Sequence, residues 1–427
     1  MFKRNFGLLF AVAFVLAYIP FVRNYGFGLI HEDSVDFPSF YYGARLAFVE
    51  GKSPYVEENL REAFREYEEN NGDYFPYLYP PPSLVFFLPF TALSYRDARL
   101  AMLAVNHLLT LAFIYILLRK IIKINLASPF SIAFTAYVFL FSPLRVTLDV
   151  GQVNIFVMTL ICLSWWMARS KSRPAWVALP LSLAILLKLY PVLFLIPLFW
   201  SRQYKAIGCV LLFVIVVSVT SAFFLPEATW QTWYSNVGSK GYTAEVMNLD
   251  VNSPANQSMF GFLLRTFFGK NVRFPPLWVV PEWVSASAPY VATGIVVSIS
   301  LLASYLTSRA KAPLPFSQLD MDFSLWSLAT FLIAPVSWDH HLVFIVPAVA
   351  VLIYTLLHAD GKFRFVVLGI SLVAAVALAF PYPYNSPDFR EGFRTLLISV
   401  PLYLVGALWL NVVVFVFSRT GRREISG

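Results

Sequence analysis

Residues 206–225, AIGCVLLFVIVVSVTSAFFL, are twenty consecutive residues without a charge. A helix needs about 20 mostly apolar residues to cross the hydrocarbon core of a bilayer, so this stretch predicts a membrane-spanning helix. Arg202 and Lys205 precede it, and Pro226 and Glu227 follow it. The stretch therefore has an apolar centre and polar boundaries, as a membrane span requires.

The composition extends this interpretation to the whole chain. Of its 427 residues, 58% are hydrophobic and only 13% are charged, whereas soluble globular domains carry roughly 25% charged residues. A water-soluble enzyme of this size is excluded. The 17% aromatic content and the two cysteines, Cys162 and Cys209, also exclude a disordered chain and a disulfide scaffold. Both cysteines lie in apolar runs, where we expect them to pack.

The apolar runs predict an all-α polytopic membrane protein, with one integral-membrane domain over residues 1–427. About twelve transmembrane helices are expected, at residues 6–22, 98–118, 128–142, 153–168, 175–187, 191–199, 206–225, 286–307, 323–337, 341–357, 365–380 and 395–416. The fifth, sixth and ninth are too short to cross alone, so we expect them inside the bundle or broken around a cavity. The first lacks a small-residue cleavage site and is predicted to remain as an anchor.

Charge distribution predicts the orientation. With the N-terminus inside, the predicted inner segments hold 17 of the 32 basic residues but only four of the 24 acidic ones. Because Lys and Arg concentrate on the cytoplasmic side, both termini are predicted to be cytoplasmic. The long loops 23–97 and 226–285 then face the periplasm or cell exterior. The net charge of +8 reflects this orientation, and no nucleic-acid partner is needed to explain it.

The first outer loop is expected to carry short helices near the membrane surface. Residues 57–69, EENLREAFREYEE, predict a solvated amphipathic helix. The prolines of residues 77–82, YLYPPP, stop any helix. The apolar residues 83–93 then predict a helix lying in the membrane interface.

The segment after the first predicted helix holds the first candidate catalytic groups. Asp33 and Asp36 stand beside aromatic residues that include Tyr41 and Tyr42. A carboxylate at a membrane boundary is suited to act as a general base, because partial desolvation raises its pKa toward neutrality. Aromatic faces beside it are suited to stack on sugar rings. Helix capping is the alternative for Asp36, because Pro38 would lie early in the following helix.

Two further outer segments carry polar groups at the membrane boundary. Gln152 and Asn154 follow Arg145 in a predicted outer turn and could bind hydroxyl or phosphate groups through their amides, with capping and interhelical bonding as alternatives. Lys188 and Tyr190 lie between two short apolar helices. Lys188 is expected to reach an outer cavity, where its partner is a phosphate or else an outer acidic residue.

His340 and His341 are the candidates in the last outer segment. Adjacent residues of a helix point about 100° apart, so they rarely ligate one ion together, and no metal site is predicted. One histidine is expected to bind a phosphate or hydroxyl while the other packs locally. In the second long loop, Asn256 and Gln257 are expected to contact ligand through their amides, although Asn256-Gln257-Ser258 is formally also a glycosylation sequon.

These motifs together resemble glycosyltransferase family 87, a group of GT-C membrane enzymes. The resemblance rests on the segment from Asp36 through Gly51-Lys52-Ser53-Pro54-Tyr55, and on five later motifs. Those motifs are Tyr-Pro-Pro at 79–81, Gly-Gln-x-Asn at 151–154, Lys-x-Tyr-Pro at 188–191, Asn-Gln-Ser at 256–258 and Ser-Trp-x-His-His at 337–341. Each motif alone is weak, but their order along nearly the whole chain is specific.

The resemblance implies a GT-C-like bundle and an inverting transfer of a sugar, expected to be mannose. The donor would be a polyprenyl-phosphate sugar and the acceptor a hydroxyl of a lipid-linked or envelope glycan on the outer face. Asp36 would be the general base, with Asp33 as the alternative. Lys188, Arg145 and a histidine would stabilise the departing phosphate, and no cofactor is implied. The sequence contains no Walker-type loop and no Rossmann glycine pattern, so no nucleotide site is predicted. The rival interpretation is a lipid or solute transporter or flippase, whose ionisable groups should lie at the membrane midplane.

Overall fold

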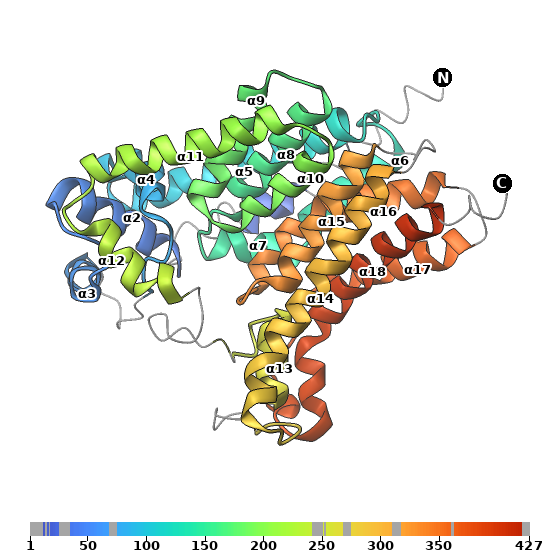
Figure 1. The fold of residues 1–427 in the computed structure, drawn as a ribbon. Helices are drawn as coiled ribbons and strands as arrows, with labels where there is room; N and C mark the ends of the chain where they lie inside the picture. Colours follow the sequence, from blue (N-terminus) through green and yellow to red (C-terminus); the bar gives the residue numbers. More distant parts are fainter. Residues whose placement is uncertain are drawn as a thin grey trace. The chain divides into compact units, whose positions relative to one another are not determined.

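The computed structural model describes residues 12, 15–16, 18–24, 35–67, 75–240, 251, 253–267, 275–309, 317–359 and 363–420. Every regular element within these residues is a helix (Figure 1). The prediction of an all-α protein is therefore confirmed for the part of the chain described. Most of the predicted first helix and Asp33 lie outside these residues, although residues 18–22 are helical.

The chain divides into two compact units. Unit 1 comprises Met1–Ala127, Leu144–Val192 and Tyr204–Leu249, and unit 2 comprises Ser128–Pro143, Leu193–Gln203 and Asp250–Gly427. This division does not test the expectation of one domain over residues 1–427, which stays a prediction.

Unit 1 is built around helix α9, which packs between α8 and α11, while α5 packs on α8. The proline-rich η4 contacts both α9 and α11, and α2 contacts α3, α4 and α5. The elements, of which α7 and η7 each have two residues in the segments of unit 2, are α2 (Phe37–Arg45), η3 (Leu46–Glu50), α3 (Glu57–Tyr67), η4 (Pro81–Ser83), α4 (Leu84–Phe87), η5 (Leu88–Ala92), α5 (Tyr95–Tyr115), η6 (Ile116–Ile121), α7 (Ser142–Asp149), α8 (Asn154–Arg169), α9 (Pro174–Leu187), η7 (Tyr190–Phe194), α11 (Tyr204–Phe224), α12 (Thr229–Asn236) and η8 (Gly238–Lys240).

Unit 2 is centred on α15, which contacts α14, α16 and α18 (Figure 1). Every residue from Leu319 to Leu332 of α15 is buried, which explains why this helix shows no polar face. The elements are α6 (Pro129–Leu140), α10 (Leu195–Trp200), α13 (Met259–Phe267), α14 (Glu282–Arg309), α15 (Gln318–Ile333), η9 (Asp339–Ile345), α16 (Val346–His358), α17 (Phe363–Ala379), η10 (Pro387–Phe389), η11 (Gly392–Ser399) and α18 (Val400–Thr420).

The described residues contain five helices long and apolar enough to cross a membrane, or six if α6 and α7 count as one bent span. These five are Tyr95–Ile121, Tyr204–Phe224, Glu282–Arg309, Asp339–His358 and Gly392–Ser418. Shorter apolar helices occur near the other predicted positions, including Asn154–Arg169 and Pro174–Leu187. The protein is thus an integral membrane protein, and the count of twelve spans stays a prediction.

Two predicted elements differ in detail from the structure. The helix expected at 323–337 begins at Gln318 and ends at Ile333, because Ala334 turns to an extended conformation before Pro335. The interface helix expected at 83–93 is three short pieces, η4, α4 and η5, since prolines interrupt the helical hydrogen bonds. The amphipathic helix expected at 57–69 is present as α3.

Candidate functional site

Asp36 stands at the N-terminal boundary of α2, yet its side chain caps no backbone group of that helix. Instead its Oδ2 accepts a hydrogen bond of 3.0 Å from Nε2 of Gln152. The backbone N–H groups of Asp36 and Phe37 both donate to the carbonyl oxygen of Val150. The start of α2 is therefore anchored by the backbone to the turn after α7, and the Asp36 carboxylate is directed toward Gln152.

The turn that presents Gln152 depends on a glycine. Gly151 has a φ of +71°, a left-handed conformation that favours glycine. The N–H of Gln152 donates to the carbonyl of Thr147, and that of Gly151 donates to the carbonyl of Leu148. These two bonds form a Schellman motif that ends α7. The Asp-Val-Gly-Gln sequence thus closes one helix and places the Gln152 side chain beside the start of α2.

Gln152 is buried and its amide oxygen has two donors. The hydroxyl of Tyr79 donates to Oε1 at 3.0 Å, and the backbone N–H of Val153 donates at 3.2 Å. With Oε1 occupied by donors, the amide nitrogen faces Asp36. The predicted binding of hydroxyl or phosphate groups by Gln152 stays a prediction, and its partners in the structure are protein groups.

Lys188 is the cation of this cluster. It follows α9 in an extended conformation and is only 8% exposed. Its Nζ donates to Oδ1 of Asn154 at 2.6 Å, and the ammonium lies 5.4 Å from the centroid of the Tyr79 ring. Such a contact between a cation and an aromatic face is favourable. Lys188 and Asn154 therefore join the end of α9 to the start of α8.

Burial shifts the two charged groups of the cluster toward neutrality. Desolvation raises the pKa of Asp36 to about 6, while the Gln152 hydrogen bond and the charge of Lys188 oppose the rise. Desolvation lowers the pKa of Lys188 to about 7, opposed by the charge of Asp36. Both groups lie outside the five membrane-spanning helices. The pair thus combines a carboxylate of raised basicity with a cation of lowered pKa, as catalytic sites commonly do.

Tyr79 is the residue of this cluster that sequence reasoning missed as a site residue. It touches both sides of the cluster, through its hydroxyl on Gln152 and its ring under Lys188. In the sequence it reads only as part of a proline-rich stretch that stops a helix. A tyrosine directly before three prolines was the one signal available in the sequence, because prolines hold an extended segment in a fixed conformation. Tyr190 in η7 interacts electrostatically with Tyr79 and is half-buried.

The aromatic residues after Asp36 pack within unit 1. The Tyr41 hydroxyl donates to the carbonyl of Leu93, and the Tyr42 ring stacks on Tyr95 at 5.5 Å. Both tyrosines are buried. Their predicted role in sugar stacking stays a prediction, and in this structure their rings support α2.

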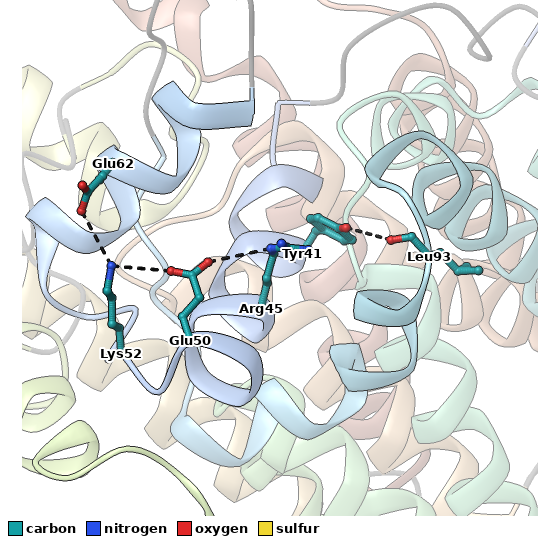
Figure 2. A network of polar contacts seen from close by, with 6 residues as sticks. All are labelled: Tyr41, Arg45, Glu50, Lys52, Glu62 and Leu93. Atoms are coloured by element: carbon teal, nitrogen blue, oxygen red, sulfur yellow. Dashed lines mark hydrogen bonds and ion pairs between the residues drawn. The ribbon is translucent and has the colours of Figure 1, made fainter.

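A surface network follows α2 along the chain, as Figure 2 shows. Glu50 pairs with Arg45 at 3.8 Å and with Lys52 at 3.7 Å, and Lys52 also approaches Glu62 of α3. These partly exposed pairs are each worth little energy. They connect α2, the Gly51 turn and α3. Lys52 of the Gly-Lys-Ser-Pro-Tyr motif thus has a structural role in joining these elements.

Arg145 lies on α7 and is half-buried. The turn predicted around Arg145 is wrong in this part, because Ser142–Asp149 forms the helix α7 and the turn begins only after it. The contact of Arg145 with a phosphate stays a prediction. Among the residues that the structure describes, no group of three His, Cys, Asp or Glu side chains could hold a metal ion.

The histidine pair lies in unit 2, in the 3₁₀ helix η9. The two rings are 4.6 Å apart between centroids and nearly perpendicular. His341 accepts a hydrogen bond of 3.1 Å from the backbone N–H of Trp338 through Nδ1. In the neutral ring the proton then resides on Nε2, which makes that atom a hydrogen-bond donor.

Asn256 and Gln257 hold this part of unit 2 together. The Asn256 amide donates to the carbonyls of Val251 and Pro335 and accepts from the N–H groups of Ser258 and Ser337. Gln257 donates through Nε2 to the carbonyls of Pro254 and Ile398. Both side chains are fully buried. Their predicted contact with ligand stays a prediction, and the contacts in the structure join three segments that lie far apart in the sequence.

Arg265 and Asp339 were not singled out from the sequence. Arg265 of α13 donates to the carbonyls of Ser253 and Asn256 and to the hydroxyl of Ser399. Asp339, next to His340, forms a hydrogen bond with Tyr384, whose pKa is raised first by burial and then by the Asp339 charge. The partners of Arg265 that the structure shows are distant in the sequence, so no local pattern marks this arginine as a candidate.

A known protein family matches the part of the chain that holds most of these motifs. The model of glycosyltransferase family 87 matches residues 77–335, which include Tyr79, Gln152, Asn154 and Lys188. Asp36 and the histidine pair lie outside the matched residues.

Two mycobacterial proteins are similar in sequence. Both are named polyprenol-phosphate-mannose-dependent alpha-(1-2)-phosphatidylinositol mannoside mannosyltransferase. The Mycobacterium tuberculosis protein is 25% identical over 65% of this chain, and this match spans 62% of that protein's length. The Mycolicibacterium smegmatis protein is 24% identical over 74% of this chain and 69% of its own length. Among solved structures, apo ArnT from Cupriavidus metallidurans aligns over 98% of this chain and 76% of its own, with 15% identity and a TM-score of 0.41.

Proposed function

Because the chain belongs to glycosyltransferase family 87, we propose that it transfers a sugar from a polyprenyl-phosphate donor to a hydroxyl of a lipid-linked or envelope glycan. Mannose is the sugar we propose, since both mycobacterial relatives are named for a polyprenol-phosphate-mannose donor. A phosphatidylinositol mannoside is the acceptor that their names suggest for a first assay.

The observation that carries the mechanism is the Asp36 carboxylate, which caps no helix and is held by Gln152. We assign it the role of general base, because a pKa of about 6 lets it be ionised at neutral pH while remaining a competent proton acceptor. It takes the proton of the acceptor hydroxyl as that oxygen attacks the anomeric carbon. Asp33, the alternative base, lies outside the described residues.

Lys188 is proposed to stabilise the leaving group. The bond between the anomeric carbon and the phosphate oxygen breaks with its electron pair on the phosphate, so negative charge grows there. A buried ammonium stabilises such charge more than an exposed one does, because the surroundings screen it less. Asn154 and the Tyr79 ring hold the ammonium in place. One displacement inverts the anomeric carbon, and no second carboxylate is needed as a nucleophile.

His341 is proposed as the histidine that contacts ligand. Its Nδ1 is occupied by the Trp338 N–H, which fixes the ring and leaves the proton on Nε2. That N–H is suited to donate to a phosphate or sugar oxygen. Asn256 supports the segment before His341, because its amide bonds to the carbonyl of Pro335 and to the N–H of Ser337. Arg265 in turn donates to the backbone carbonyl of Asn256.

The reaction is proposed to occur on the outer face of the membrane. The two long loops that supply Asp36 and Asn256 are predicted to lie on the side where acidic residues outnumber basic ones. Both termini would then be cytoplasmic, and the donor and acceptor would approach from the outer leaflet.

Incubation of membranes containing the protein with several polyprenyl-phosphate sugars, followed by mass analysis of the glycolipids, tests this proposal. We expect one hexose to be added from the polyprenyl-phosphate mannose, with release of polyprenyl phosphate. Movement of the donor across the bilayer without any new glycoside would instead support the transporter interpretation and contradict the proposal.

A further inference from the structure

We propose that Tyr79 is a positioning residue, whose hydroxyl fixes the Gln152 amide in the one orientation that holds Asp36 as the base. The inference rests on the proposed role of Asp36 in sugar transfer. It assigns a function to a residue of the Tyr-Pro-Pro segment and a different function to Gln152 from the ligand contact predicted for it.

The two ends of the Gln152 amide have opposite hydrogen-bonding roles. A glutamine amide can rotate by 180° and exchange its donor and acceptor ends. If it did so here, Oε1 would face the Asp36 carboxylate, and two acceptors would confront each other. The Val153 N–H can only donate and opposes that rotation, and the Tyr79 hydroxyl, which donates to Oε1, would have to turn and accept instead. Gln152 therefore presents an N–H to Oδ2 of Asp36, which leaves Oδ1 as the oxygen to accept the proton.

Tyr79 is itself held rigidly enough to act in this way. Its backbone carbonyl accepts a hydrogen bond of 2.6 Å from the hydroxyl of Tyr55. Its ring lies 4.9 Å from Phe40 and 5.6 Å from Tyr77, measured between centroids. Phe40 is on α2, the helix that follows Asp36. The phenol is thus fixed against the same helix whose first turn bears the carboxylate.

Among the residues that the structure describes, which begin again at residue 35, few ionisable groups act on Asp36. The charge that acts on it is that of Lys188, and Tyr190 interacts with Tyr79. The helices α3 and α5 pack on α2. On α3, Arg61 forms an ion pair with Glu57, and on α5 the Asp97 carboxylate accepts a hydrogen bond from Ser94.

Further charged residues lie on the two elements that the Asp36 hydrogen bonds connect: Arg145 and Asp149 on α7, and Arg45 and Glu50 at and beyond the opposite end of α2. All of them are unchanged by a substitution at Tyr79 or Gln152. A change in the titration of Asp36 then reports the hydrogen bonds among these three residues.

Tyr79→Phe removes only the hydroxyl and keeps the ring under Lys188, so it separates the two contacts of Tyr79. The matched control is Tyr77→Phe. Tyr77 is a buried tyrosine two residues away, and its hydroxyl bonds to Ser83 instead of Gln152. Gln152→Met removes the hydrogen bond to Asp36 directly at similar side-chain length. The double variant Tyr79→Phe/Gln152→Met shows whether Tyr79 acts through Gln152.

The experiment measures the pH dependence of mannose transfer from labelled polyprenyl-phosphate mannose to phosphatidylinositol mannoside, using the full-length protein in membranes. Loss of a hydrogen bond to the carboxylate should move the acidic limb of kcat/KM upward by about one pH unit in Gln152→Met. Tyr79→Phe should move it the same way by less, because the Val153 N–H remains. The double variant should match Gln152→Met, and Tyr77→Phe should match the wild type.

An acidic limb that stays in place in both Tyr79→Phe and Gln152→Met would overturn the inference, as would a double variant whose shift is the sum of the two single shifts. Asp36→Asn is measured alongside. If Asp36→Asn retains transfer, the proposed function of Asp36 fails. If Asp36→Asn is inactive while the limb does not move, only the role of Tyr79 and Gln152 fails.

Discussion

At Asp36, position in the chain and side-chain contact point to different roles, and the contact decides between them. An aspartate just before a helix that has Pro at its second position is expected to cap it. The Asp36 side chain bonds to Gln152 instead, 116 residues away in the sequence. Leaving the start of α2 without a side-chain cap costs stability. Such a cost is typical of a residue whose side chain has a functional role.

The pH dependence of transfer follows from the two shifted groups. Asp36 must be ionised to accept a proton, so kcat/KM should fall as the pH drops through about 6. Lys188 must be protonated to stabilise phosphate, so kcat/KM should fall again as the pH rises through about 7. A bound phosphate favours the ammonium, so the alkaline limb of kcat should lie at higher pH than that of kcat/KM. Steady-state rates from pH 5 to 9 measure both limbs, and a flat profile would contradict this assignment.

Most candidate residues could be found from the sequence, but their contacts could not. Asp36, Gln152, Asn154 and Lys188 are polar residues at the boundaries of apolar runs, and that contrast singles them out. Tyr79 could not be found in the same way, because aromatic residues are frequent in this chain. Its role depends on a contact with Gln152 across 73 residues, which no local pattern encodes.

Among the elements, the segment Asn256-Gln257-Ser258 shows how a motif can be structural. Gly261, in the first turn of α13, is where the helix meets the Asn256 side chain. A Cβ at this glycine would lie 2.6 Å from Nδ2 of Asn256 and 3.0 Å from its backbone oxygen. The glycine therefore leaves room for Asn256 to bond to Pro335 and Ser337, which precede the histidine pair in the sequence.

Gly261→Ala should accordingly destabilise unit 2 by about 1–3 kcal/mol, because the new methyl group displaces Asn256. Gly369→Ala in α17 is the matched control, since its Cβ would meet nothing within 4 Å. There alanine should be neutral or stabilising by up to about 1 kcal/mol, because glycine weakens a helix interior. Thermal unfolding in detergent micelles measures both. Equal unfolding temperatures for the two variants would contradict the role given to Gly261.

Helix positions were more predictable than helix ends. The long apolar helices α5, α11, α14 and α18 each lie within a few residues of the predicted ranges. The ends of α15 and the break into η4, α4 and η5 depend on single prolines and on tertiary contacts, which hydropathy averages away. The separation into two units could not be predicted either, because it follows from contacts between distant segments.

For the whole molecule, the asymmetry of charge predicts one orientation in the bilayer. A single cysteine in place of exposed Glu58 of α3 should react with an impermeant maleimide in intact cells. A cysteine in place of exposed Lys171, after α8, should react only once the membrane is opened. Cys162 and Cys209 are replaced by alanine in both proteins. The reverse pattern of labelling would contradict an outer site.

The central claim is that this chain moves a sugar from a polyprenyl phosphate with Asp36 as the base. Its most direct test is the purified protein in lipid vesicles, supplied with labelled polyprenyl-phosphate mannose and phosphatidylinositol mannoside and no nucleotide sugar. We expect label to pass to the glycolipid in the wild type, and transfer by Asp36→Asn to fall at least about 100-fold at an unchanged level of folded protein. Equal transfer by the two proteins, or none by the wild type, would contradict the account.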